Sequence, residues 1–136
     1  MIAVLVLTHG NLARELLDAA RMIDSQIEAS SAALALPWDE DSDESSAKLK
    51  KQLRELDNGD GVIILTDMFG GTASNLAMPF LAPGKVEVVT GVNLPMLIKL
   101  ASLRSHDLSL YDLAVRLTEA AQKSMRVASD FLRKTT

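Results

Sequence analysis

The stretch Ile2-Ala3-Val4-Leu5-Val6-Leu7-Thr8-His9-Gly10 is an apolar run that stops at a histidine. A strand that is buried on both faces is a continuous Val/Ile/Leu run, and in open parallel sheets ligands bind beyond the carboxyl ends of the strands. The stretch therefore predicts a buried central strand that places His9 at the end of the sheet where a ligand binds.

Apolar runs and helical patterns alternate along the rest of the chain. Helices are expected at 11–23 with Asn11 as N-cap, from 42 or 43 to 57, from 70 to about 81, after Asn93, and from about 109 to 134. Further strands are expected at 32–36, 61–66 and 86–90. Alternating strands and helices predict an α/β fold over residues 1–136, a doubly wound three-layer sandwich around a mainly parallel sheet of four strands.

Length and composition narrow the class of protein. A chain of 136 residues holds one well-buried core, and no apolar run reaches the roughly 20 residues of a membrane span. A net charge of -4, with no basic cluster beyond residues 48–51, argues against nucleic-acid binding. The absence of cysteine excludes disulfides and thiolate chemistry. The start of the chain lacks the features of a signal peptide, so a cytoplasmic protein is expected.

Two polar residues follow the two most apolar strands, His9 after the first and Asp67 after the third. If these strands are neighbours in a parallel sheet, the two side chains lie close together. A carboxylate that accepts the N–H of one imidazole nitrogen leaves the other nitrogen with a free lone pair and stabilises positive charge on the ring. The pair predicts a nucleophile or a base, and it provides too few ligands for a metal site.

The segment Gly70-Gly71-Thr72 begins the predicted third helix. Unpaired N–H groups at a helix start attract anions, and glycines let a ligand approach the backbone closely. The hydroxyls of Thr72, and of Thr8 and Ser74, are candidate further donors. A histidine nucleophile beside an anion-binding helix start suggests chemistry on a phosphoryl group.

Each feature also has a purely structural interpretation. Alone, His9 could be a turn residue, Asp67 a helix cap and the glycine pair an ordinary strand-to-helix turn. His106 is interpreted as a surface residue. Trp38, the only tryptophan, fits loop packing or a surface that a partner contacts.

Three blocks together resemble the motifs of the enzyme IIA component of mannose-family sugar phosphotransferase systems, in the same order and at similar separations. They are Val6-Leu7-Thr8-His9-Gly10, Thr66-Asp67-Met68-Phe69-Gly70-Gly71-Thr72-Ala73-Ser74-Asn75 and Gly91-Val92-Asn93-Leu94-Pro95-Met96-Leu97. The resemblance implies that His9 accepts a phosphoryl group from the phosphocarrier protein HPr and passes it to an enzyme IIB through a phosphohistidine intermediate, without a cofactor. It implies that Asp67 orients His9 and that Thr72 and the helix start hold the phosphoryl oxygens.

The resemblance also implies a homodimer with an antiparallel edge strand near the C-terminus, which would fall at 123–128. Any membrane association would be peripheral, through IIB. The chain departs from the family pattern at Ala73 and Ser74, where a proline and an aromatic residue are common. It also ends at Thr136 without the IIB domain that many relatives carry, so a separate acceptor protein is expected.

Three other functions are compatible with the same residues. The chain could be a regulatory phosphoprotein of an incomplete phosphotransferase system that does not transport sugar. It could be the phosphotransferase subunit that serves dihydroxyacetone kinase, which has the same fold. The third alternative is a plain small-molecule-binding domain.

Overall fold

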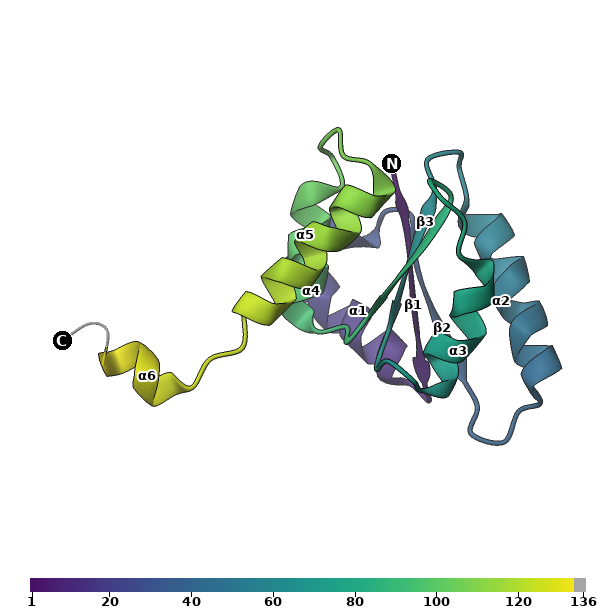
Figure 1. Cartoon of the computed structure of the whole chain (residues 1–136), viewed down its shortest axis with the longest axis horizontal. Coiled ribbons are helices and arrows are strands. Elements are labelled where there is room, and N and C mark those ends of the chain that lie inside the picture. The colour runs from purple at the N-terminus through teal and green to yellow at the C-terminus, as the bar shows by residue number, and fades with distance from the viewer. Residues whose placement is uncertain (134–136) are drawn as a thin grey trace.

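The centre of the molecule is a sheet of four parallel strands (Figure 1). In a computed structural model that describes residues 1–133, the strand order is β2-β1-β3-β4. The strands are β1 (Ala3–His9), β2 (Ser31–Leu36), β3 (Val62–Thr66) and β4 (Val86–Thr90). Strand β1 pairs with β2 on one side and β3 on the other, with Leu5 opposite Ala32 and Ile64. The predicted sheet, its central first strand and the pairing of β1 with β3 are confirmed.

Helices cover both faces of the sheet. One face is covered by α1 (Leu12–Ile23), α4 (Leu94–Leu103) and α5 (Leu110–Lys123), and the other by α2 (Ser42–Leu56) and α3 (Thr72–Ala77) (Figure 1). Two short 3-10 helices, η1 (Ser25–Glu28) and η2 (Met78–Phe80), follow α1 and α3. The predicted three-layer α/β fold is confirmed.

Strand β1 contributes to the cores on both faces. Val4 and Val6 pack against the layer of α1, α4 and α5, whereas Leu5 and Leu7 pack against the layer of α2 and α3. All four side chains are fully buried. Because a slip of one residue would exchange the two sets, packing on both faces fixes the register and therefore the position of His9.

The start of α1 differs from the sequence-based expectation. Asn11 occupies the N-cap position, but its side chain makes no capping hydrogen bond. The hydroxyl of Thr8 instead accepts the N–H of Ala13, with an N···O distance of 2.7 Å. Thr8 reaches this N–H because it precedes the tight turn at Gly10, whose φ of +54° favours glycine.

The expected antiparallel edge strand at 123–128 is absent from the part of the chain that the structure describes. Lys123 ends α5, residues 124–127 form no regular structure, and α6 (Ala128–Arg133) follows. This segment leads away from the sheet (Figure 1), so no strand edge of the same chain lies within its reach. The helix expected from about 109 to 134, whose tail from Met125 fits a helix or a short edge strand, ends at Lys123, and residue 134 lies outside the described residues.

A lipid bilayer sets a minimum length and hydropathy for any helix that crosses it. Among residues 1–133, no helix meets both requirements.

Candidate functional site

His9 and Asp67 meet at the carboxyl end of the sheet, as the topology predicts. His9 is the last residue of β1, and Asp67 follows the last residue of β3. The Nδ1 atom of His9 lies 3.0 Å from Oδ2 of Asp67, and the backbone N–H of His9 donates to the same oxygen at 3.2 Å. A carboxylate only accepts hydrogen bonds, so Nδ1 carries a proton, and in the neutral imidazole the lone pair lies on Nε2.

The carboxylate of Asp67 accepts hydrogen bonds at both of its oxygens. The N–H of Met68 donates to Oδ1 at 2.9 Å, in addition to the two donors of His9 at Oδ2. Partial burial raises the pKa of Asp67, but these hydrogen bonds, mainly those from His9, outweigh burial, so the net pKa is lowered. Asp67 is thus held as an anion next to the imidazole, where it stabilises positive charge on the ring.

The indole of Trp38 stacks on the imidazole of His9. The ring centroids are 4.7 Å apart and the planes differ by 15°, while the Trp38 residue is 81% exposed. Sequence reasoning left Trp38 between loop packing and a partner surface and missed this contact. A signal was present, because Trp38 follows β2, the other neighbour of β1, and Leu36 of β2 is in register with His9.

The segment from Gly70 to Thr72 forms the turn into α3 beside the imidazole. Gly70 has a φ of +81°, a conformation that favours glycine. A Cβ atom at Gly71 would lie 3.6 Å from Cε1 of His9 and 3.0 Å from Cγ of Met68, so the backbone here passes close to the ring. Thr72 is exposed at the first position of α3.

The hydroxyls of Thr8 and Ser74 are occupied within the protein. Both residues are fully buried. Thr8 caps α1 and donates to the carbonyl of His9 at 3.2 Å. Ser74 accepts the N–H of Gly70 and donates to the carbonyl of Gly71, each at 3.0 Å. The expectation that these two hydroxyls face a ligand is therefore not met, because both hold the loops around His9 in place.

Exposed apolar side chains lie on the segments that follow β1, β2 and β3. They are Leu12, Trp38, Met68 and Phe69, each between 47% and 81% accessible, and Trp38 contacts His9 directly. Exposed apolar side chains at this end of the sheet suit contact with another protein.

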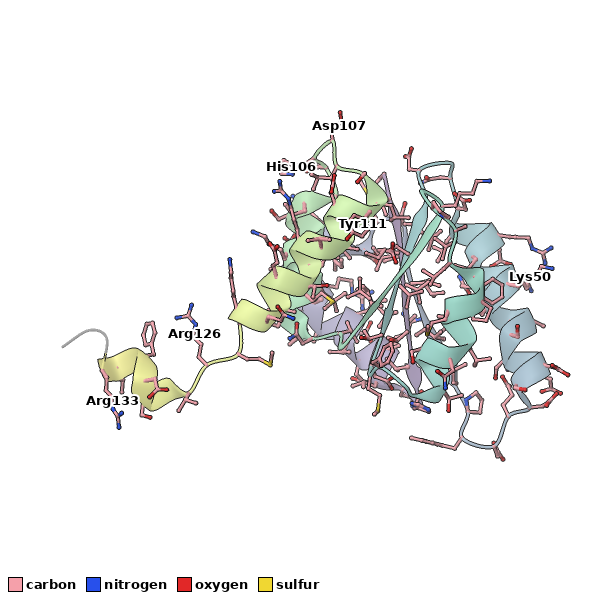
Figure 2. All side chains as sticks on the ribbon, in the orientation of Figure 1. Lys50, His106, Asp107, Tyr111, Arg126 and Arg133 are labelled. Atoms are coloured by element: carbon pink, nitrogen blue, oxygen red, sulfur yellow. The ribbon has the colours of Figure 1, made fainter. Side chains whose placement is uncertain are left out.

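The second histidine lies far from this site. His106 and Asp107 occupy the loop between α4 and α5, at the opposite end of the sheet from the carboxyl ends of the strands (Figure 2). Across residues 1–133, no group of three or more His, Asp or Glu side chains is arranged to hold a metal ion. The geometry pairs the imidazole of His9 with the carboxylate of Asp67 through Nδ1, which in the neutral ring leaves the lone pair on Nε2.

Comparison with known proteins confirms the resemblance drawn from the motifs. The family model described as the PTS system fructose IIA component (EIIA-man) matches residues 3–117. A PTS system fructose-specific EIIA component of Bacillus subtilis (strain 168) is 33% identical over 137 residues, covering 98% of this chain and 91% of the relative.

Two further similarities extend this result. A PTS system mannose-specific EIIAB component of Escherichia coli (strain K12) is 31% identical over 126 residues, covering 92% of this chain but 39% of the relative. The structure of a phosphotransferase system component EIIA from Streptococcus agalactiae superimposes with a TM-score of 0.85 over 96% of this chain and 99% of that chain. Because the two sequences are 20% identical, this likeness concerns the fold alone.

Proposed function

The chain belongs to the EIIA-man family of sugar phosphotransferase system components, and we propose that it carries a phosphoryl group on His9 from HPr to an enzyme IIB. The observation that carries the proposal is the His9–Asp67 pair at the carboxyl end of the sheet. In this proposal the chain acts as a cytoplasmic transferase with a phosphohistidine intermediate. In this proposal any link to a membrane permease is made through IIB.

The geometry suits Nε2 of His9 as the phosphoryl acceptor. The lone pair of Nε2 attacks the phosphorus of phospho-HPr, a new N–P bond forms, and the N–P bond of the donor breaks with its electron pair returning to the donor imidazole. The positive charge that His9 gains is compensated by Asp67 through the proton on Nδ1. Transfer to IIB is the same displacement with IIB as the nucleophile. Such transfers depend mainly on positioning and charge stabilisation.

We assign the contacts with the phosphoryl oxygens to Gly71 and Thr72. The backbone of Gly71 passes close to Cε1, a ring atom bonded to Nε2, and Thr72 is exposed at the start of α3. Gly70 has a different part in this proposal, because its N–H already donates to Ser74. Gly70 shapes the turn that leads into Gly71 and Thr72.

Phosphorylation with a matched histidine control tests the proposal. Incubation with phosphoenolpyruvate, enzyme I and HPr is expected to add one acid-labile phosphate, detected by mass spectrometry. His9→Ala abolishes the label, whereas His106→Ala at the opposite end of the sheet retains it. A label that persists in His9→Ala refutes the proposal. Addition of a IIB protein then separates a carrier, which loses its phosphate, from a regulatory phosphoprotein, which keeps it.

We further propose that the chain is a homodimer joined through its C-terminal segment. Residues 124–133 extend away from the body and expose Met125, Val127 and Phe131 (Figures 1 and 2). Beyond the bridge from Ala82 to Val86, the outer edge of β4 pairs with no strand in the described part of the chain. An apolar groove that includes Leu81, Val88 and Val115 runs beside this edge. The segment of one copy would lie along the β4 edge of the other.

The dimer is tested by the molar mass in solution. The wild type is expected to elute as a dimer in size-exclusion chromatography with light scattering, and Val127→Asp as a monomer. Ser105→Asp, an exposed substitution at the far end of the sheet, serves as the control and remains a dimer. A wild type that is monomeric at all concentrations contradicts the proposal.

A further inference from the structure

We propose that Trp38 is a positioning residue for phosphoryl transfer, in which the indole holds the plane of the His9 ring so that Nε2 faces the donor. This inference rests on the proposed function of His9 as phosphoryl acceptor. It adds a residue outside the three motif blocks of the chain, on the loop that follows β2.

The hydrogen bond from His9 to Asp67 restrains only one edge of the imidazole. The ring can still rotate about its Cβ–Cγ bond within the range that the Nδ1···Oδ2 hydrogen bond allows, and any such rotation moves Nε2, on the far side of the ring. The indole of Trp38 covers one face of the ring at 4.7 Å with only 15° between the planes, which opposes this rotation. The ring is thus held at an edge by Asp67 and on a face by Trp38, while Nε2 stays free of both.

The position of Trp38 is set by its neighbours. The N–H of Gly10 donates to the carbonyl of Leu36 at 3.0 Å, which joins the turn after His9 to the end of β2. A Cβ atom at Gly10 would lie 3.7 Å from Nε1 of Trp38, so the indole lies directly over this turn. Glu40 anchors the other end of the loop, because its carboxylate accepts the Ser45 hydroxyl at 2.7 Å.

Glu40 is held to α2 by a second contact. Lys48 of α2 forms an ion pair with it, and the hydrogen bonds from Lys48 and Ser45 lower the pKa of Glu40. The loop that carries Trp38 is therefore tied at both ends, to β2 and to α2. Core packing does not explain the residue, because the side chain remains largely exposed apart from its contact with the imidazole.

The stack also suits the charge that develops during transfer. The face of an indole ring carries negative electrostatic potential and attracts cations. When Nε2 of His9 bonds to phosphorus, the imidazole becomes positively charged, and the Trp38 face then stabilises the ring together with Asp67. If the interaction free energy of a stacked aromatic pair is made only in the transition state, it corresponds to roughly a three- to tenfold change in the rate of transfer.

Single-turnover transfer from phospho-HPr measures this contribution. Trp38→Ala is expected to lower the rate at saturating phospho-HPr by about three- to tenfold, and Trp38→Phe to restore most of it, because a phenyl ring also stacks. Tyr111→Ala removes an exposed aromatic side chain near the start of α5, towards the other end of the sheet, and retains the wild-type rate (Figure 2). A Trp38→Ala variant that changes only the half-saturating concentration of phospho-HPr overturns the inference, because Trp38 then acts in docking alone.

Fluorescence tests the stack independently of turnover. Trp38 is the only tryptophan, so the emission of the chain reports on its surroundings. Both His9→Ala and phosphorylation of the wild type are expected to change that emission. If the wild type accepts no phosphate, the proposed function fails and the role of Trp38 with it. If the wild type is phosphorylated but His9→Ala leaves the emission unchanged, only the inference about Trp38 is overturned.

Discussion

Removal of the Asp67 carboxylate is the most direct test of how the site works. In Asp67→Ala the imidazole of His9 loses the acceptor of its Nδ1 proton and the anion that compensates its charge. Both side chains of the pair are mostly buried, with 19% of His9 and 15% of Asp67 accessible, so water replaces the lost interaction only in part. A hydrogen bond to a charged group contributes about 1.5–3 kcal/mol. We therefore expect phosphorylation to slow by roughly 10- to 150-fold.

The amide variant separates charge from orientation. The three donors around Asp67 are two N–H groups of His9 and one of Met68. An asparagine has one acceptor oxygen, so its NH2 group faces an N–H group in either orientation. With the oxygen towards His9, Asp67→Asn keeps the ring oriented but loses the negative charge. Its rate is expected to lie between those of the wild type and Asp67→Ala.

Rapid-quench phosphorylation with phospho-HPr at saturation gives the rates, and circular dichroism establishes that each variant is folded. Asp39→Ala removes the same charge from an exposed position on the loop beside Trp38 and controls for the general electrostatic field. A folded Asp67→Ala variant with a rate within about twofold of the wild type, well below the range expected for this bond, would remove Asp67 from the mechanism.

Three further predictions concern the surroundings of the pair. Thr8→Val removes the capping hydroxyl of α1 and is expected to lower the free energy of unfolding by about 0.5–2 kcal/mol. The buried hydroxyl of Thr66 has no hydrogen-bond partner in residues 1–133, so Thr66→Val is expected to leave that free energy unchanged or to raise it, as measured by urea unfolding. Gly71→Ala places a Cβ atom 3.6 Å from Cε1 of His9, where it crowds the approach to the ring, and 3.0 Å from Cγ of the exposed Met68 side chain, which can move aside. Rapid-quench assays should therefore show slower phosphorylation with little loss of stability. Because the pKa of Asp67 is lowered on folding, its contribution to stability is complete above about pH 4 and is lost as the pH falls through the pKa of the folded state. The urea midpoints of the wild type and Asp67→Asn should therefore converge in acid.

The fold was predictable where residues are buried on both faces of the sheet. The runs in β1 and β3 are apolar at nearly every position, which suits only a central strand with helices on both sides. Residues 124–133 were not predictable in this way. The spacing of Met125, Val127 and Phe131 fits a helix or a strand, and the choice depends on the surface that covers these side chains.

The candidate site was predictable as far as topology decides it. Neighbouring parallel strands bring His9 and Asp67 together regardless of loop detail. The roles of the Thr8 and Ser74 hydroxyls were not predictable. A hydroxyl that holds a loop differs from one that binds a ligand only in which backbone groups lie within its reach. Trp38 was missed for a related reason. Its contact depends on the conformation of a loop that is set by the hydrogen bond between Gly10 and Leu36, which are distant in the sequence, and by the contact of Glu40 with Ser45.

The surroundings of His9 favour an open site over an enclosed one. The two hydroxyls that could have lined a pocket instead brace the loops, and the imidazole is held by a carboxylate at one edge and an indole on one face. Beside the ring lies the backbone of Gly71, followed by the exposed Thr72 at the start of α3. A phosphoryl group on His9 would therefore be held only weakly by this chain. A carrier that must give its phosphate to a second protein needs such weak retention, because every additional hydrogen bond to the phosphoryl oxygens would have to break before delivery and would slow it.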